Sequence, residues 1–258
     1  MRIGVIGCGT MGSAFAQMLS KKHTLFLSSG NNEKIKILAK KIGATIADSI
    51  TVCETADLII LCVKPKDIDE LAKQISKSCS GKIVISLLAG IRLATLESLF
   101  PKAHLIRMMP NLPIICGEGV LGIVEPLDPM IRQQTVSLFD GMGLVYFLPE
   151  TKMDAFTALC GSSPAFILLM MEAMMEGAVA LGFALTDARK LVLQSFKGAV
   201  ALLEDTQTYP SELKMKIASP GGTTIAGLQE MELRGIRAGL IQTLFACYHK
   251  SCELARSG

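Results

Sequence analysis

The sequence predicts an α/β protein in which an N-terminal, doubly wound parallel sheet is followed by an all-helical domain. Short β-branched runs alternate with longer helical stretches over residues 1–150, which is typical of a parallel sheet covered on both faces. A glycine-rich turn follows the first of these runs, and no strand pattern is evident after residue 152. The boundary is therefore expected at residue 150, which gives domains of residues 1–150 and 151–258.

The elements of the first domain follow from this alternation. The runs at 58–63 and 83–87 are almost wholly apolar, as expected for strands that helices cover on both faces. The predicted strands are 2–6, 24–27, 58–63, 83–87 and 105–107, and the predicted helices are 11–22, 32–42, 67–78 and 94–99. A further strand, helix and strand are expected at 119–124, 130–141 and 144–148.

The second domain is expected to be helical and to bind a second copy of the chain. Its helical stretches, at 165–181, 186–205, 211–217 and 224–257, are rich in Met, Leu and Ala on more than one face. Residues 155–171 carry no charge, but residues 161–164 interrupt the run and Glu172 follows it. A membrane-spanning helix needs about 20 mostly apolar residues, so a buried or interface helix is expected here and no membrane contact.

Composition narrows the class of protein. The 258 residues are 50% hydrophobic and 19% charged, a composition that favours a globular core. The net charge is +3 and the chain has no block of basic residues, so the sequence does not indicate a nucleic-acid-binding surface. The eight cysteines form no CxxC pair, and with three histidines they predict no metal site. Scattered cysteines and the absence of a signal peptide before the first strand indicate a cytoplasmic protein.

The turn after the first strand predicts a dinucleotide site. Gly7, Gly9 and Gly12 form a GxGxxG pattern between a strand and a helix, as in Rossmann-type domains. The first glycine permits the tight turn, the second lets the backbone approach the pyrophosphate, and the third allows close packing of the helix on the strand. The alternative is a flexible turn without a ligand. The predicted cofactor-binding residues here are Gly7, Cys8, Gly9, Thr10, Met11 and Gly12.

The end of the second strand indicates which dinucleotide binds. An NAD site usually has an acidic residue about 20 residues after the first glycine, whereas this chain has Ser28, Ser29 and Asn31. These side chains can donate hydrogen bonds to a 2′-phosphate, although an ordinary helix cap would use the same residues. NADPH is therefore favoured over NADH, which stays an alternative.

A second distinctive loop lies in the helical domain. The segment Ser219-Pro220-Gly221-Gly222-Thr223-Thr224-Ile225-Ala226-Gly227 precedes a long helical stretch. Two glycines allow close approach to the backbone, and a helix start offers N–H groups to an anion such as a carboxylate. A turn followed by a helix cap is the alternative.

This loop resembles the characteristic segment of pyrroline-5-carboxylate reductases. Other stretches agree with that family in order and spacing along nearly the whole chain. They are 7–12, 56–65, Ser86 with 89–91, 107–111, and Asp154 with 161–165. The chain departs from the family pattern at Ser49, Ser163 and Lys216, where Asn, Gly and Asn are expected respectively.

The resemblance implies a helical domain that interlocks with a partner in a homodimer or a larger homo-oligomer. It also implies reduction of 1-pyrroline-5-carboxylate to L-proline, the last step of proline biosynthesis, with NADPH or NADH. The family pattern assigns Ser29, Ser49, Val63, Lys64, Pro65, Leu88, Ala89 and Gly90 to the dinucleotide, and Glu150, Ser219, Gly222, Thr223 and Thr224 to the substrate.

The chemistry of imine reduction suggests roles for two further groups. No histidine lies in any of these motifs, so Thr224 is expected to act as a hydrogen-bond donor or proton relay, with the imine arriving already protonated. Asn111, together with Pro110 and the pair Ala89-Gly90, is expected to shape the nicotinamide pocket, and simple turn chemistry is the alternative.

Two other functions fit the sequence less well. β-Hydroxyacid dehydrogenases share the domain order, but they carry a catalytic lysine on a glycine-rich helix, and 161–165 has none. A dinucleotide-sensing module would have no need for the second anion site at Ser219–Thr224. The choice between five- and six-membered cyclic imines stays open.

Overall fold

The computed structural model describes residues 1–30, 32–125 and 128–257 and divides into two compact units. The first unit consists of Met1–Pro164 and Cys247–Gly258, and the second of Ala165–Ala246. The end of the chain belongs to the first unit partly because the Ser251 hydroxyl donates a 2.7 Å hydrogen bond to Asp154. The domain boundary at residue 150 stays a prediction, which this division by contacts does not decide.

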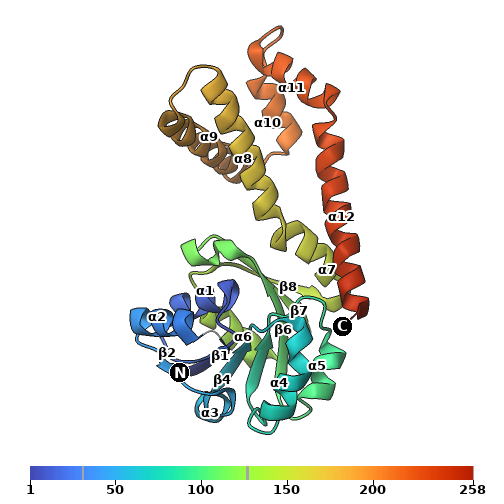
Figure 1. Cartoon of the computed structure of the whole chain (residues 1–258). Helices are drawn as coiled ribbons and strands as arrows, with labels where there is room; N and C mark the ends of the chain where they lie inside the picture. The colour runs from blue at the N-terminus through green and yellow to red at the C-terminus, as the bar shows by residue number, and fades with distance from the viewer. Residues whose placement is uncertain (31, 126–127, 258) are drawn as a thin grey trace. The chain divides into compact units, whose positions relative to one another are not determined.

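The first unit is built on an eight-stranded sheet (Figure 1). Its strands are β1 (Arg2–Ile6), β2 (Thr24–Ser28), β3 (Thr45–Ile46), β4 (Leu58–Leu61), β5 (Ile83–Ser86), β6 (His104–Pro110), β7 (Gly119–Glu125) and β8 (Gly143–Pro149). They lie in the order β3-β2-β1-β4-β5-β6-β7-β8, and β6 with β7 is the antiparallel pair among the described strands. Because β2 lies on one side of β1 and β4 on the other, the sheet reverses its winding at β1, where open α/β sheets bind ligands.

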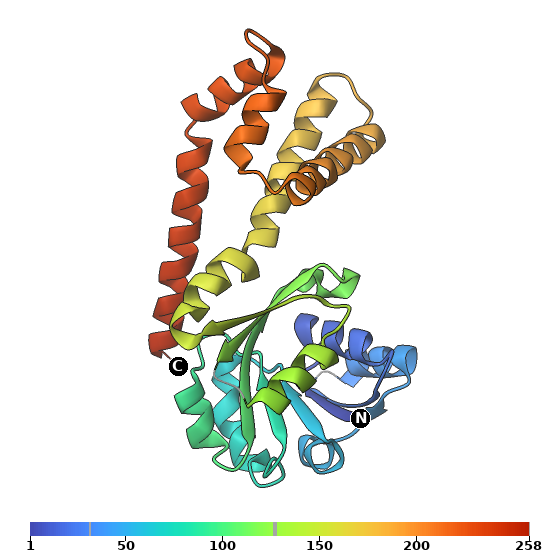
Figure 2. The same cartoon turned by 180° about the vertical axis from the view of Figure 1, so that it is seen from behind.

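Helices cover both faces of this sheet. One layer contains α1 (Thr10–Leu19), α2 (Asn32–Ile42) and α6 (Pro129–Leu138), and the other contains α3 (Ser49–Thr55), α4 (Ile68–Ile75) and α5 (Leu93–Leu99). Side chains alternate along β4, so that Ile60 is buried in the first layer and Ile59 in the second. Figure 1 shows α4 and α5 in front of the sheet, and the reverse view in Figure 2 shows α6 in front. The predicted doubly wound sheet is confirmed.

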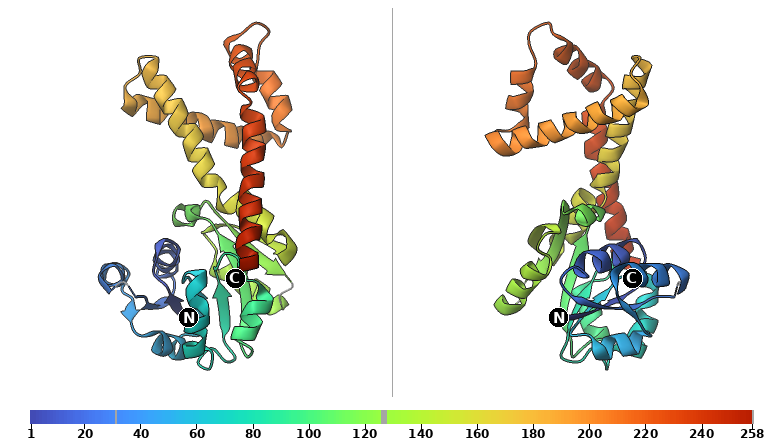
Figure 3. Two further views of the ribbon diagram at one scale, coloured as in Figure 1. Left: turned by 45° about the vertical axis from the view of Figure 1, so that its right-hand side comes forward. Right: turned by 90° about the vertical axis from the view of Figure 1, so that its left-hand side faces the viewer.

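The second unit and the chain end are helical, as predicted. The helices are α8 (Ser163–Ala180), α9 (Leu185–Thr206), α10 (Pro210–Ile217), α11 (Thr223–Leu233) and α12 (Ile236–Ser257), and Figure 3 shows the turn that joins α10 to α11. The prediction of a single helix at 224–257 is wrong, because the chain breaks after Arg234. Gly235 adopts a φ of +67°, a left-handed conformation that ends a helix.

Two short elements of the first unit were missed. The strand β3 and the helix α3 occupy residues for which the sequence pattern predicts neither. The cap of α3 is a side-chain effect: the Asp48 carboxylate accepts hydrogen bonds of 3.0 Å from the N–H groups of Ile50 and Thr51. The Thr51 hydroxyl also donates a 2.7 Å hydrogen bond to this carboxylate. That bond first, and then the N–H bonds, hold the pKa of Asp48 below its usual value.

The part of the uncharged stretch 155–171 that lies on α8 is largely exposed within one chain. Among the described residues, Glu150–Ala180 is the one segment long and apolar enough to cross a membrane by length and composition, and 6% of its apolar window is buried. Leu168 and Leu169 on α8 are both more than half exposed. The expectation of a helix buried within its own chain is therefore not met along α8, and its place at an interface stays a prediction.

Candidate functional site

The backbone of the glycine-rich turn is shaped by Gly7 and Gly12. Gly7 has a φ of +95°, and a Cβ on it would lie 2.6 Å from the carbonyl carbon of Cys62. A Cβ on Gly12 would lie 1.9 Å from the carbonyl oxygen of Gly7, so α1 can pack on the turn only without a side chain there. Both glycines are therefore required by the protein itself, in the roles predicted from the sequence.

Gly9 differs, because the packing of the described residues does not require a glycine there. No atom of the residues that the structure describes comes within 4 Å of the place where a Cβ would be, and its φ of −72° suits any residue. Gly9 is the N-cap of α1, and no side chain caps that helix end. The first N–H groups of α1 thus face an open position to which a phosphate could come close, which fits the pyrophosphate of a dinucleotide.

The structure brings two of the predicted cofactor residues together. Ser28 ends β2 and Ser49 begins α3, and their hydroxyl groups lie 2.9 Å apart in a hydrogen bond. These two hydroxyl groups lie at the carboxyl end of β2, and Ser29 follows directly in the chain. Asn31 lies outside the described residues. Asp48 is the functional neighbour that the sequence analysis missed, since its cap sets the position of Ser49.

The other predicted cofactor residues follow β4 and β5. Val63, Lys64 and Pro65 lie after β4, where Lys64 precedes the 3₁₀ turn η1 (Pro65–Asp67). Leu88, Ala89 and Gly90 lie after β5, and Gly90 has a φ of +80°. A Cβ on Gly90 would lie 3.1 Å from the carbonyl oxygen of Leu254 in α12. The carboxyl ends of β1, β4 and β5 share one edge of the parallel sheet, so these loops border the glycine-rich turn.

Asn111 is engaged by the protein on both sides of its amide. Its Oδ1 accepts a 2.8 Å hydrogen bond from Val120 N–H, and its Nδ2 donates a 3.0 Å bond to the carbonyl oxygen of Cys160. Cys160 lies in a π-helical turn, η4 (Thr157–Gly161), which changes the usual pairing of backbone carbonyls. The side chain therefore supports this turn, and its predicted cofactor role stays a prediction.

Glu150 has two protein partners. Its Oε1 accepts a 2.6 Å bond from Arg107 Nη1 and a 2.8 Å bond from Leu93 N–H. The assignment of Glu150 to the substrate stays a prediction, and Arg107 was missed as a partner. The sequence did contain a signal for this pair: Arg107 is the single charged residue in the apolar run 105–109. A charged side chain in a buried strand requires a counter-charge, so an acidic partner could have been expected.

The predicted substrate loop opens α11. Gly222 is the N-cap without a side-chain cap, and its own N–H donates a 3.0 Å bond to the carbonyl oxygen of Ser219. Because this N–H is already bonded, the N–H groups of the loop that could hold a carboxylate are those of Thr223 and Thr224, which begin the helix and have no intrahelical acceptor. A Cβ on Gly222 would lie 2.5 Å from the Ser219 hydroxyl oxygen.

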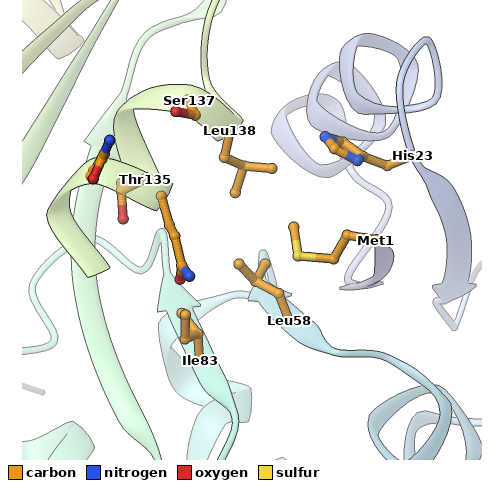
Figure 4. A pocket seen from close by; sticks show the side chains of 9 residues that line it. Met1, His23, Leu58, Ile83, Thr135, Ser137 and Leu138 are labelled. Atoms are coloured by element: carbon orange, nitrogen blue, oxygen red, sulfur yellow. The ribbon is translucent and has the colours of Figure 1, made fainter. Parts of the chain in front are cut away.

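A cavity of about 450 Å³ lies away from these loops (Figure 4). Met1, Leu58 and Ile83 line it, and they mark the amino ends of β1, β4 and β5, opposite the edge that carries the glycine-rich turn. His23 also lines the cavity, and burial lowers the pKa of its imidazole. None of the predicted site residues borders this cavity.

Known proteins match the chain over its full length. The sequence model described as pyrroline-5-carboxylate reductase dimerisation matches residues 150–254, and that of NADP oxidoreductase, coenzyme F420-dependent, matches residues 2–90. A pyrroline-5-carboxylate reductase of Synechocystis sp. is 32% identical over 99% of this chain and 99% of its own length. The chain belongs to the pyrroline-5-carboxylate reductase family.

Solved structures of this family have the same fold as this chain. The reductase of Streptococcus pyogenes superposes with a TM-score of 0.88 at 30% identity, covering 97% of this chain and 98% of its own. A Plasmodium falciparum pyrroline carboxylate reductase with NADP bound gives 0.89 at 25% identity, with 99% of both chains covered. The predicted family, fold class and oxidoreductase activity are thus confirmed, and the dimerisation match supports a homo-oligomer.

Proposed function

We propose that the chain reduces 1-pyrroline-5-carboxylate to L-proline with NADPH as its reductant, in the cytoplasm and without membrane or nucleic-acid partners. The observation that carries this proposal is Gly9, which the protein's own packing does not require and which leaves the start of α1 open to a phosphate in a chain of this family. The test is to measure the oxidation of NADPH in the presence of pyrroline-5-carboxylate. The same assay is repeated with NADH in place of NADPH, and with the six-membered cyclic imine in place of the five-membered one.

The residues present fit a dinucleotide. Bound NADPH supplies the hydride. The N–H groups at the start of α1, residues 10–12, would hold the pyrophosphate, and Ser28, Ser29 and Ser49 would donate hydrogen bonds to the 2′-phosphate. The loops after β4 and β5 would border the nicotinamide half, because they lie on the far side of β1 from β2.

The helical residues would bind the imine. The N–H groups of Thr223 and Thr224 face a substrate carboxylate without a charged side chain, and Ser219 shapes the turn before them. The Thr224 hydroxyl would donate to the ring nitrogen as hydride is added to the neighbouring carbon, because the nitrogen of the iminium gains its lone pair only during that step. A threonine hydroxyl is a poor free acid, so the substrate binds as the protonated iminium.

The three serines lead to a prediction about cofactor preference. Ser29→Asp sets a carboxylate against the 2′-phosphate, so kcat/KM with NADPH is expected to fall at least about tenfold while that with NADH falls much less. Steady-state kinetics with both cofactors measure this. Ser29→Ala, which removes the hydroxyl without adding charge, is the matched control. Equal loss with both cofactors would place Ser29 away from the 2′-position.

Exposed leucines on α8 lead to a prediction about assembly. We propose that the helices of the second unit join two copies in an obligate homodimer, which can assemble further. Leu168→Asp, at 63% exposure, is expected to dissociate the oligomer and abolish activity. Ile37→Asp on α2, at 70% exposure, is the matched control and is expected to change neither. Sedimentation that finds an active wild-type monomer of 27.6 kDa would contradict this.

A further inference from the structure

We propose that Asp48 is a positioning residue for the choice of cofactor. Its cap of α3 holds the Ser49 hydroxyl where the 2′-phosphate of NADPH binds, and so favours NADPH over NADH. This inference rests on the proposed function, because it concerns the cofactor of that reaction.

The hydroxyl groups of Ser28 and Ser49 together have one hydrogen to offer a ligand. They lie 2.9 Å apart, so one of them donates to the other. Ser28 is 7% exposed and Ser49 is half-buried, so Ser49 is the member that an acceptor from solution can reach. A phosphate oxygen is such an acceptor, and a hydrogen bond to it is stronger than one to the neutral 2′-hydroxyl of NADH.

Asp48 fixes the backbone directly after Ser49. Its carboxylate accepts hydrogen bonds of 3.0 Å from the N–H groups of Ile50 and Thr51, and one of 2.7 Å from the Thr51 hydroxyl. The carboxylate therefore occupies the N–H groups that open the helix. A phosphate at this place has to be bound by hydroxyl groups, and the position of the Ser49 side chain becomes decisive.

The segment before Asp48 is joined to β2. Ile46 of β3 pairs with Leu27, and the N–H of Ala47 donates a 3.1 Å bond to the carbonyl oxygen of the same leucine. Leu27 directly precedes Ser28 in the chain. The backbone is thus fixed on both sides of the Ser49 position, by the sheet before it and by the cap after it.

The far end of α3 is held independently of this cap. Lys82 Nζ donates hydrogen bonds of 2.9 and 2.7 Å to the carbonyl oxygens of Glu54 and Ala56. Val52 packs on β1 so closely that a Cβ on Gly4 would lie 2.7 Å from its Cγ1. Loss of the cap is therefore expected to loosen the first turn of α3 while the rest of the helix stays in place.

The charge of Asp48 acts in the opposite direction from its cap. A carboxylate near a 2′-phosphate repels it, although solvent and salt weaken this effect at an exposed position. A change that removes the cap and the charge together would mix the two effects. The test therefore compares two neutral side chains, one with and one without a capping oxygen.

These two variants are Asp48→Asn and Asp48→Ala, since asparagine caps a helix about as well as aspartate and alanine does not. Asp128→Ala is the matched control, because the Asp128 carboxylate caps α6 with bonds of 2.8 and 3.3 Å from the N–H groups of Met130 and Ile131. The helix α6 follows β7, which runs antiparallel to β6, so this cap lies at the opposite edge of the sheet from Ser49.

The measurements are thermal unfolding and the Kd of NADPH and of NADH, each without substrate. Asp48→Ala and Asp128→Ala are both expected to lower the unfolding temperature by about 2–4 °C, as for the loss of one cap. Asp48→Ala is expected to bind NADPH about 5- to 10-fold more weakly than Asp48→Asn, with NADH Kd values within about twofold of each other. Asp128→Ala is expected to bind both cofactors as wild type does.

A second comparison tests whether Asp48 acts through Ser49. In a Ser49→Ala background, the difference in NADPH Kd between the two Asp48 variants is expected to disappear. A difference that persists would overturn this route. Equal NADPH Kd values for Asp48→Asn and Asp48→Ala would overturn the role of the cap.

Two further results have distinct meanings. An equal loss of affinity for NADPH and NADH in Asp48→Ala would make the cap purely structural, which also overturns the proposal. Wild-type protein that binds NADPH without reducing the imine would instead contradict the proposed function, and the Kd comparisons would still decide the role of Asp48.

Discussion

Gly9→Ala is expected to abolish tight NADPH binding while the protein still folds. The new methyl group meets no atom of the part of the chain that the structure describes, since nothing there lies within 4 Å, and the φ of −72° is ordinary for alanine. The change in unfolding free energy is expected to stay below about 1 kcal/mol, because a weaker N-cap offsets the lower entropy of the unfolded chain. The methyl group does occupy the space where the backbone would meet the pyrophosphate. We therefore expect the Kd of NADPH to rise at least about 100-fold, which direct binding measures.

Gly12→Ala is the matched control within the same turn. Its methyl group would lie 1.9 Å from the carbonyl oxygen of Gly7, a backbone atom that cannot rotate away. This variant is expected to lose about 1–3 kcal/mol of unfolding free energy or more, because α1 must move off the turn. Gly9→Ala with wild-type NADPH affinity would show that the pyrophosphate does not approach this position.

Thr224→Ala is expected to lower kcat roughly 10- to 150-fold with little change in NADPH affinity. The hydroxyl meets a nitrogen that gains basicity during reduction, so a lost hydrogen bond of about 1.5–3 kcal/mol appears in the transition state. Single-turnover kinetics and NADPH titration separate the two quantities. Full kcat in this variant would mean that Thr224 has no catalytic role.

Gly222→Val in the same loop is expected to act differently. Its side chain would crowd the Ser219 hydroxyl, which lies 2.5 Å from the position of a Cβ. It would thereby distort the turn whose N–H groups, at Thr223 and Thr224, are proposed to bind the carboxylate. Carboxylate binding is similar in the ground and transition states, so the imine KM is expected to rise while kcat changes little. If both variants lose NADPH affinity, the loop belongs to the cofactor site.

Sequence patterns were sufficient where a short stretch has one physical solution. The wholly apolar run of β4 fits a strand covered on both faces, and GxGxxG between a strand and a helix fits a dinucleotide turn. The break at Gly235 was missed because glycine is also tolerated inside helices, and only the backbone φ of +67° shows that it ends one. The helix α3 was missed because its cap depends on one aspartate, Asp48.

By itself the sequence determined the fold class, the family and the glycines of the cofactor turn, because periodicity and motif spacing are local properties of the chain. The tertiary structure alone separated Gly9, which the protein leaves open, from Gly12, which packing requires. It alone joined Glu150 to Arg107 and Leu93, which are 43 and 57 residues away along the chain. Such partners are chosen by strand order and burial, and a buried charge takes whichever counter-charge the fold brings within reach.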